Sequence, residues 1–462
     1  MPVQQDDAPV SAIERLVTEH YRCPSGLVDL PPPGSWPQDA NETDLGLTTA
    51  CDGASSRRLM STRPTGPLDE ALNAARHAHD GARFTADPGE LVAKLRSEWY
   101  TGDDCGPGGS RLIQSRPFRN LYYQLRSLLP MHLRKHLQKA YLRGWNKIAF
   151  PRWPVDTTVD WILERLLELP LQRGTVRAVP FIWFWPDGAT SAVTMTHDVE
   201  HLAGRNFCSR LMDLDDSVGI KSSFELVPEG RYSLPETFLE EIRTRGFEIN
   251  VHDLNHDGRL FSSHAAFLQR VGRINSYGKR YRALGFRSGG LYRNQAWYDA
   301  LDFSYDMSVP NTAHLDPQRG GCCTIMPFFV GRVLELPLTT SQDYSLFHIL
   351  NDYSIDLWKQ QLRLIMERHG LATFLVHPDY IIEKRARKTY QALLEHLTRL
   401  REEKRLWIAL PGEVDSWWRK RRRMSIVQEG GKWAIRGPGS ERARLAFATL
   451  NDDSLSFTVE GR

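Results

Sequence analysis

The sequence lacks several features that would each assign it to a particular class of protein. No stretch approaches the run of about 18 apolar residues that a membrane-spanning helix requires. The first residues contain no basic segment followed by an apolar one, so we expect no secretory signal peptide and a cytoplasmic location. The six cysteines are scattered, without the paired spacing of a zinc ribbon, which favours reduced thiols in that compartment.

An excess of charge of one sign is also absent from the chain as a whole. A net charge of +3 on 462 residues argues against a general affinity for nucleic acid. The exception is the block of residues 111–155, which carries ten Lys or Arg and no acidic residue. Its helical spacing places basic residues such as Arg134, Lys135 and Lys139 opposite an apolar face. Such a helix can pack on the main domain, or it can lie peripherally on the anionic inner face of a membrane and approach a lipid-linked sugar.

The length of the chain exceeds what a single hydrophobic core usually covers, which predicts a main domain with appendages. Residues 1–110 are rich in Pro and Gly breakers and predict a partly irregular accessory region. The basic segment at residues 111–155 follows, and residues 156–423 form the predicted main domain. Residues 424–462 contain short alternating segments between turn residues, which predict a small antiparallel β appendage.

Short apolar strands alternate with helices throughout the predicted main domain, and this pattern predicts a parallel sheet. Polar residues lie at, or just past, the C-terminal ends of five different predicted strands: Asp198, His252, Arg287, Asp306 and His377. In a closed barrel these ends share one rim, whereas an open sheet concentrates them near its switch point. Five contributing strands favour a barrel, although each residue alone also has an ordinary structural explanation such as a helix cap or an ion pair.

A pair of histidines four residues apart, His252 and His256, follows one of these strands. A divalent ion of the zinc class binds neutral imidazole and carboxylate ligands and keeps one position for water. The spacing alone is weak evidence, because the chain contains fifteen histidines. An acid from the segment around Asp198 could complete a three-ligand site.

Five motifs resemble those of the polysaccharide deacetylases of carbohydrate esterase family 4. In chain order they are THDVE at Thr196–Glu200, HDLNH at His252–His256, FRSGG at Phe286–Gly290, YDMS at Tyr305–Ser308 and LVH at Leu375–His377. The resemblance covers roughly residues 190–380. It implies the distorted (β/α)7 barrel of that family, here with the N-terminal accessory region and the C-terminal β appendage.

The resemblance also implies a catalytic role for four of these residues. Asp198 would be the general base, and Arg287 would orient it. His377 would be the general acid that protonates the leaving amine, and Asp306 would tune this acid. These roles suit an amide, which at neutral pH needs an activated water, a base and an acid for its poor leaving group.

The first motif departs from the Thr-Phe-Asp-Asp pattern of the family at its second acid. Val199 stands at this position and cannot bind a metal. The implied ligands of a divalent metal, zinc in the first place, are then Glu200 with His252 and His256. His201 is a competing ligand.

The sequence therefore predicts a metal-dependent hydrolase that removes an N-acetyl group, or less readily an O-acetyl group, from a saccharide or sugar intermediate. The expected partner is an acetylated saccharide and not nucleic acid. One alternative is a non-catalytic saccharide-binding or scaffold protein of the same fold that has lost the metal, which Val199 favours. A metal hydrolase of a non-sugar amide would use the same residues.

Overall fold

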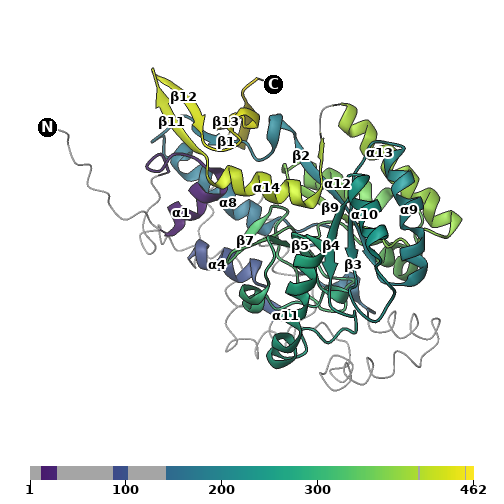
Figure 1. The fold of residues 1–462 in the computed structure, drawn as a ribbon. Helices are drawn as coiled ribbons and strands as arrows, with labels where there is room; N and C mark the ends of the chain where they lie inside the picture. Colours follow the sequence, from purple (N-terminus) through teal and green to yellow (C-terminus); the bar gives the residue numbers. More distant parts are fainter. Residues whose placement is uncertain (1–11, 29–86, 102–141, 404–405, 453, 462) are drawn as a thin grey trace. The chain divides into compact units, whose positions relative to one another are not determined.

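The structure, a computed structural model, describes residues 12–28, 87–101, 142–403, 406–452 and 454–461 (Figure 1). Most of the basic segment predicted at residues 111–155 therefore lies outside the described residues. Its described part contains a short 3-10 helix, Trp145–Lys147. No helix in the described ranges is long and apolar enough to cross a membrane.

The chain divides into two compact units. One unit comprises Thr101–Thr157 and Ala189–Ser416, and the other comprises Met1–Tyr100, Thr158–Gly188 and Trp417–Arg462. We call the first the barrel unit and the second the terminal unit. The terminal unit combines residues from both ends of the chain with a segment that directly precedes the barrel strands in the sequence.

Among the described residues, seven parallel strands of the barrel unit form one row: β2 (Ser191–Val199), β3 (Ser223–Leu226), β4 (Glu248–His252), β5 (Gly285–Arg287), β6 (Tyr305–Asp306), β8 (Val333–Glu335) and β9 (Leu371–Leu375). They lie in the order β9-β2-β3-β4-β5-β6-β8. Just past β8, the hydroxyls of Thr339 and Thr340 donate to carbonyls of β9 at 2.7 and 2.8 Å, so the two ends of the row meet. The predicted distorted (β/α)7 barrel is confirmed by this strand order.

Two further strands extend the sheet of the barrel unit. β10 (Leu406–Ile408) pairs in parallel with the first residues of β2, and β7 (Phe328–Val330) pairs antiparallel with β8. All nine residues of β2 are buried, as expected for a parallel strand that is covered on both faces.

Helices connect the strands and cover the barrel: α9 (Leu202–Asp216), α10 (Glu236–Thr244), α11 (His264–Tyr281), α12 (Asp356–Met366) and α13 (Lys384–Glu402). Figure 1 shows β3, β4 and β5 side by side, with α9, α10 and α11 outside them. The apolar faces of these helices and the outward faces of the strands form one large core cluster. This core holds the C-terminal ends of the parallel strands in fixed positions.

The terminal unit contains α1 (Ala12–Tyr21), α4 (Pro88–Arg96), α8 (Thr158–Gln172), β1 (Val179–Ile182) and the strands after residue 424: β11 (Ser425–Glu429), β12 (Lys432–Arg436), β13 (Leu445–Asn451) and β14 (Ser454–Val459). The predicted C-terminal antiparallel strands are thus present. Their larger sheet has the order β1-β13-β14, so β1 belongs to the C-terminal strands and not to the barrel. Helix α14 (Pro411–Arg422) begins in the barrel unit and ends in the terminal unit.

Candidate metal centre

The end of β2 brings two carboxylates to the C-terminal rim of the barrel. Asp198 is the second-last residue of the strand, and Glu200 is the first residue after the strand. Because side chains alternate along a strand, these two residues share one side, while Val199 is directed into the core cluster with Leu226 and Val251. The alternation therefore explains how Glu200 can take the position that Val199 cannot fill.

The end of β4 supplies the two histidines. His252 is the last residue of the strand, and both Asp253 and His256 have backbone angles in the left-handed region, with φ of 58° and 53°. This tight turn, rather than a helix, brings the rings of His252 and His256 together, with their centroids 4.9 Å apart.

The two imidazoles converge on Glu200. Glu200 Oε1 lies 2.9 Å from His256 Nε2 and 3.9 Å from His252 Nε2, and the latter nitrogen lies 3.4 Å from Asp198 Oδ2. Neighbouring ligands of a tetrahedral zinc ion would be about 3.3 Å apart, given bonds of about 2.0 Å. The spacing of these atoms thus fits a single small divalent ion.

The hydrogen bonds of the histidines also favour metal binding. His252 Nε2 and His256 Nε2 are buried and have no hydrogen-bond partner, and the 2.9 Å approach to Glu200 does not have hydrogen-bond geometry. The opposite nitrogen, His252 Nδ1, lies 3.1 Å from the carbonyl oxygen of Arg287. A proton held there leaves the lone pair of Nε2 directed into the site, which is how metal-binding histidines are usually oriented. A cation between the two nitrogens and Glu200 would satisfy both of these buried atoms.

Ligand atoms within 4.8 Å of one another form two groups in the described ranges, Glu200 with His252 and His256, and Glu200 with Asp198 and His377. His201 belongs to neither group. It occupies the N-cap position of α9.

The candidate base Asp198 is paired with Arg287. Arg287 Nη1 donates to Asp198 Oδ1 at 2.7 Å, and its Nε donates to the carbonyl of Met307 at 3.0 Å. Burial raises the pKa of Asp198, but the positive charges of Arg287, His252 and His377 outweigh it and hold this pKa below its usual value. Asp198 is therefore an ionised acceptor at the floor of the site.

The candidate acid His377 is held by Asp343, a residue that the sequence analysis missed. His377 Nδ1 lies 2.6 Å from Asp343 Oδ1, and the backbone N–H of His377 donates to Asp343 Oδ2 at 2.7 Å. His377 Nε2 faces the site, 3.5 Å from Glu200 Oε1. Burial lowers the pKa of His377, but Asp343 and Glu200 outweigh it and raise this pKa well above its usual value.

Asp306, which was predicted to tune the acid, makes no direct contact with His377 in the described residues. Asp306 ends β6 as expected, but its oxygens accept from the backbone N–H and the hydroxyl of Ser308, each at 2.9 Å. Its register partner on β8 is Glu335. Because side chains in register on adjacent parallel strands point the same way, Asp306 meets Glu335, and none of its contacts within the described residues is with His377.

Glu225 in β3 is a second residue near the site that the sequence did not predict. Its Oε2 accepts from the backbone N–H of His197 at 2.8 Å and lies 3.6 Å from Arg287 Nη1. An isolated acid inside a four-residue apolar strand gives no recognisable signal. Asp343 gives none either, since it lies in a short helical turn just before the π-helix Ser345–Leu350.

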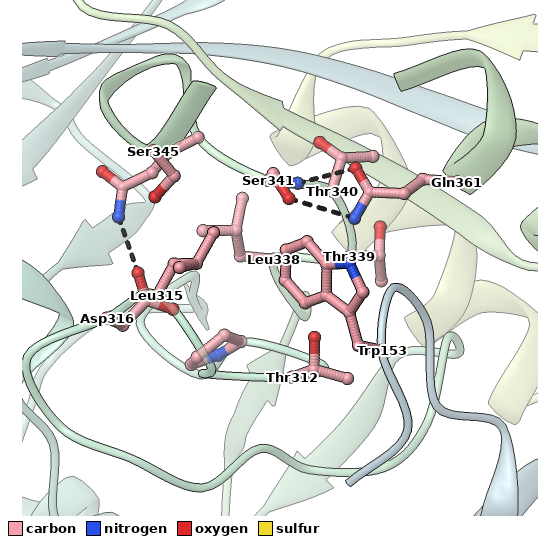
Figure 2. A pocket seen from close by; sticks show the side chains of 12 residues that line it. Trp153, Thr312, Leu315, Asp316, Leu338, Thr339, Thr340, Ser341, Ser345 and Gln361 are labelled. Carbon is pink, nitrogen blue, oxygen red and sulfur yellow. Dashed lines mark hydrogen bonds between the residues drawn. The ribbon is translucent and has the colours of Figure 1, made fainter. Parts of the chain in front are cut away.

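A hollow elsewhere in the barrel unit does not contribute to this site (Figure 2). It is lined mainly by hydroxyl and amide side chains beside Trp153, and Gln361 is bonded to the backbone N–H and the hydroxyl of Ser341 at 2.9 and 3.2 Å. None of the candidate metal ligands, Asp198 or His377 lines it, so the hollow is separate from the candidate centre.

No protein-family model matches the sequence, and no curated protein matches it. Among solved structures, one from Mycobacterium smegmatis assigned as a polysaccharide deacetylase is 18% identical over 52% of this chain and 93% of its own, with a TM-score of 0.43. A peptidoglycan deacetylase from Bacillus subtilis is 12% identical over 49% of this chain and 90% of its own, with a TM-score of 0.32. An allantoinase is 12% identical over 51% of this chain and 92% of its own, with a TM-score of 0.40. Solved polysaccharide deacetylases are thus among the structures to which this chain is similar.

Proposed function

We propose that this protein is a metal-dependent hydrolase that removes the N-acetyl group from a saccharide or sugar intermediate. The observation that carries the proposal is the convergence of Glu200, His252 and His256, with two buried imidazole nitrogens that lack a hydrogen-bond partner. A base and an acid flank the same point, since Asp198 lies beside His252 and His377 beside Glu200. An amide with a poor leaving group needs this combination.

Glu200, His252 and His256 would hold the ion, for which zinc suits the ligand types best. Bound there, a divalent ion supplies Lewis-acid polarisation of the acyl group and lowers the pKa of water. The side chain of Glu200 keeps 12% exposure, so the site opens to solvent at this ligand.

Asp198 and His377 would move the protons. Arg287 holds Asp198 Oδ1 and keeps the carboxylate ionised, which leaves Oδ2 to accept a proton from the attacking water. The contact between His377 Nδ1 and Asp343 leaves the Nε2 proton directed into the site, where it can pass to the leaving nitrogen. Each residue thus holds its proton state before substrate arrives, as efficient acid–base catalysis requires.

Aromatic rings lie beside the candidate acid and would suit a saccharide substrate. Tyr380 packs 4.7 Å from the ring of His377, and His348 packs 4.8 Å from Tyr380. Tyr344 adds a third ring, 5.2 Å from His348, at the start of the π-helix Ser345–Leu350. Aromatic walls with a few converging polar groups are typical of small-molecule sites and suit the apolar face of a sugar ring.

The rival proposal is a non-catalytic saccharide-binding protein of the same fold. Its support is Val199, which faces the core in place of an acid. The two proposals differ in whether Glu200 binds metal, and this can be measured directly. The peripheral membrane contact of residues 111–155 and the cytoplasmic location stay predictions.

Metal analysis of the purified protein, together with acetate release from a panel of acetylated sugars, tests the proposal. We expect about one divalent ion per chain, its loss in Glu200→Gln, and loss of acetate release with metal retained in Asp198→Asn. The matched control is Asp302→Asn, which changes an exposed acid paired with Lys279 and Arg332 and should behave as wild type. A wild type with neither bound metal nor acetate release would favour the non-catalytic protein.

A further inference from the structure

A fully buried histidine joins the strand of the candidate base to the strand of the candidate acid. We propose that His197, supported by Asp215 and Tyr390, is a positioning residue that fixes the separation of Asp198 and His377. This inference rests on the proposed function for its catalytic meaning, although the separation itself can be measured independently of activity.

The ring of His197 uses both of its nitrogens. Nδ1 lies 3.0 Å from the carbonyl oxygen of Val376, the residue directly before His377. Nε2 lies 3.3 Å from Asp215 Oδ2 on helix α9. His197 itself directly precedes Asp198 in β2. The residue next to the candidate base is therefore hydrogen-bonded to the residue next to the candidate acid.

The contact between His197 and Val376 matters because it lies at the end of the paired part of β2 and β9. The paired register of β2 and β9 ends with Thr196 opposite Leu375, and the last backbone hydrogen bond runs from Val376 N–H to the carbonyl of Thr196 at 3.0 Å. Asp198 and His377 both lie beyond this point. Within the described residues, the His197 ring therefore makes the last hydrogen bond between the two strands before Asp198 and His377.

The carboxylate that holds the ring is itself held from two other elements. Tyr390 of α13 donates its hydroxyl to Asp215 Oδ1 at 2.5 Å, and Ser222 Oγ donates to Asp215 Oδ2 at 2.7 Å. His197, Asp215 and Tyr390 are all fully buried. The ring consequently has one orientation, set by groups on α9, α13 and the residue before β3.

Simple core packing does not account for these contacts. Taking a carboxylate and an imidazole out of water costs free energy that apolar side chains of similar volume would not cost. The phenylalanine of the family motif described above would fill the same space. What an aromatic hydrocarbon cannot supply is a directional bond to the Val376 carbonyl, and catalytic geometry depends on such constraints because a displacement of about 1 Å can lower the rate about 100-fold.

Two substitutions at position 197 distinguish the effect of the hydrogen bond to Val376 from the effect of the contact with Asp215. His197→Asn can place its amide nitrogen near the position of Nδ1 and keep the bond to Val376, whereas His197→Phe removes it. We expect His197→Phe to lower kcat by about 100-fold, with KM and metal content unchanged, and His197→Asn to retain most of kcat. Both variants should lose thermal stability, since both leave Asp215 without its ring partner.

A second pair of variants provides a matched control for stability. Tyr390→Phe removes a buried hydroxyl that donates to Asp215, and Trp417→Phe removes a buried N–H that donates to the carbonyl of Phe184 in the terminal unit. We expect both to lower Tm, but only Tyr390→Phe to lower kcat. Equal kcat losses in the two variants, or wild-type kcat in folded His197→Phe, would overturn the positioning role.

Crystal structures of wild type and His197→Phe provide a test that needs no substrate. The proposal expects the distance between the Asp198 carboxylate and His377 Nε2 to change or to become heterogeneous in the variant. An unchanged distance would contradict it. If wild type releases no acetate from any sugar, the proposed function fails, while this structural comparison still decides whether His197 sets the geometry.

Discussion

At the scale of single residues, the candidate centre depends on which acceptor holds the Nδ1 atom of each histidine. His252 Nδ1 faces a neutral acceptor, the carbonyl of Arg287, whereas His377 Nδ1 faces the carboxylate of Asp343. A carbonyl acceptor at Nδ1 fixes the tautomer whose Nε2 can bind a metal, whereas a carboxylate at Nδ1 favours the protonated imidazole that can act as an acid. The two histidines thus suit different purposes because the partners of their Nδ1 atoms differ.

Substitution of Asp343 by Asn should weaken the acid. The raised pKa of His377 depends on this carboxylate, so its removal lowers the pKa and His377 loses its proton at a lower pH. We expect kcat to fall about 10-fold to 100-fold, with the alkaline limb of the pH–rate profile displaced to lower pH. The comparison variant is Asp306→Asn; a limb that moves in this variant and not in Asp343→Asn would restore the role first assigned to Asp306.

Gly289 lies against the second histidine, and its lack of a side chain is required there. A Cβ atom at this position would lie 2.6 Å from Asp253 Oδ2 and 2.8 Å from His256 Cδ2. We expect Gly289→Ala to displace His256 and to weaken metal binding about 10-fold to 100-fold, as measured by competition with a chelator. Gly272→Ala in α11 is the control, since its Cβ meets nothing within 4 Å and alanine favours a helix. Unchanged metal affinity in Gly289→Ala would mean that His256 is not a ligand.

At the scale of elements, strand β2 determines the centre. The alternation of side chains along β2 directs Asp198 and Glu200 to the site and Val199 to the core.

In the terminal unit, one side chain connects several elements. Arg421 of α14 is buried and donates to the carbonyls of Ile182 and Trp183 and to those of His20 and Tyr21, at 2.7 to 3.1 Å. It thereby joins α14 to α1 and to the end of β1.

Replacement of Arg421 by Lys should destabilise the terminal unit. Burial lowers the pKa of Arg421 to about 9, and no carboxylate is among its hydrogen-bond acceptors in the described residues. One ammonium group cannot reach all four carbonyls, and each buried carbonyl left without a donor costs about 1–3 kcal/mol. We expect the free energy of unfolding in urea to fall by about 2–4 kcal/mol. Arg422→Lys, at an exposed position, should leave it unchanged.

At the scale of the whole molecule, stability should depend on pH through Glu248, a partly buried acid outside the centre. Glu248 accepts from the hydroxyl of Tyr305, and from Asn250 Nδ2 and the backbone N–H of Gly412, each at 3.0 Å. Burial nevertheless raises the pKa of Glu248 from 4.5 to about 7. The folded state therefore binds a proton that the unfolded chain releases at lower pH.

The sign of this effect follows from the raised pKa. The stabilisation is complete below about pH 4.5 and is lost as the pH rises through about 7. We expect Glu248→Gln to remove this part of the pH dependence, which is on the order of 3 kcal/mol, in urea unfolding measured between about pH 5 and 8. Glu395→Gln, an exposed change on α13, is the control. A wild-type slope in Glu248→Gln would mean that another group is responsible.

Local patterns in the sequence predicted much of the fold and of the candidate site. Alternating strands and helices predicted the barrel. Strand ends, together with the resemblance to the deacetylase motifs, predicted six residues that the structure brings to one rim: Asp198, Glu200, His252, His256, Arg287 and His377. These predictions succeed because the period of a strand and the residue that ends it are local properties of the chain.

Contacts between distant segments could not be predicted in this way. The pairing of β1 with β13 joins residues more than 250 positions apart, and Asp343 reaches His377 from a helical turn 34 residues earlier in the chain. The ring of His197 likewise depends on Asp215 and Tyr390.

The sequence by itself therefore determined the residue types of the centre, the strands that carry them and the departure at Val199. Only the tertiary structure decided that Asp343 and not Asp306 holds the acid, and that His197 links the base strand to the acid strand. The physical reason is that hydrogen-bond partners are set by distances in space, to which a loop or a helix far along the chain can contribute as readily as a neighbouring residue.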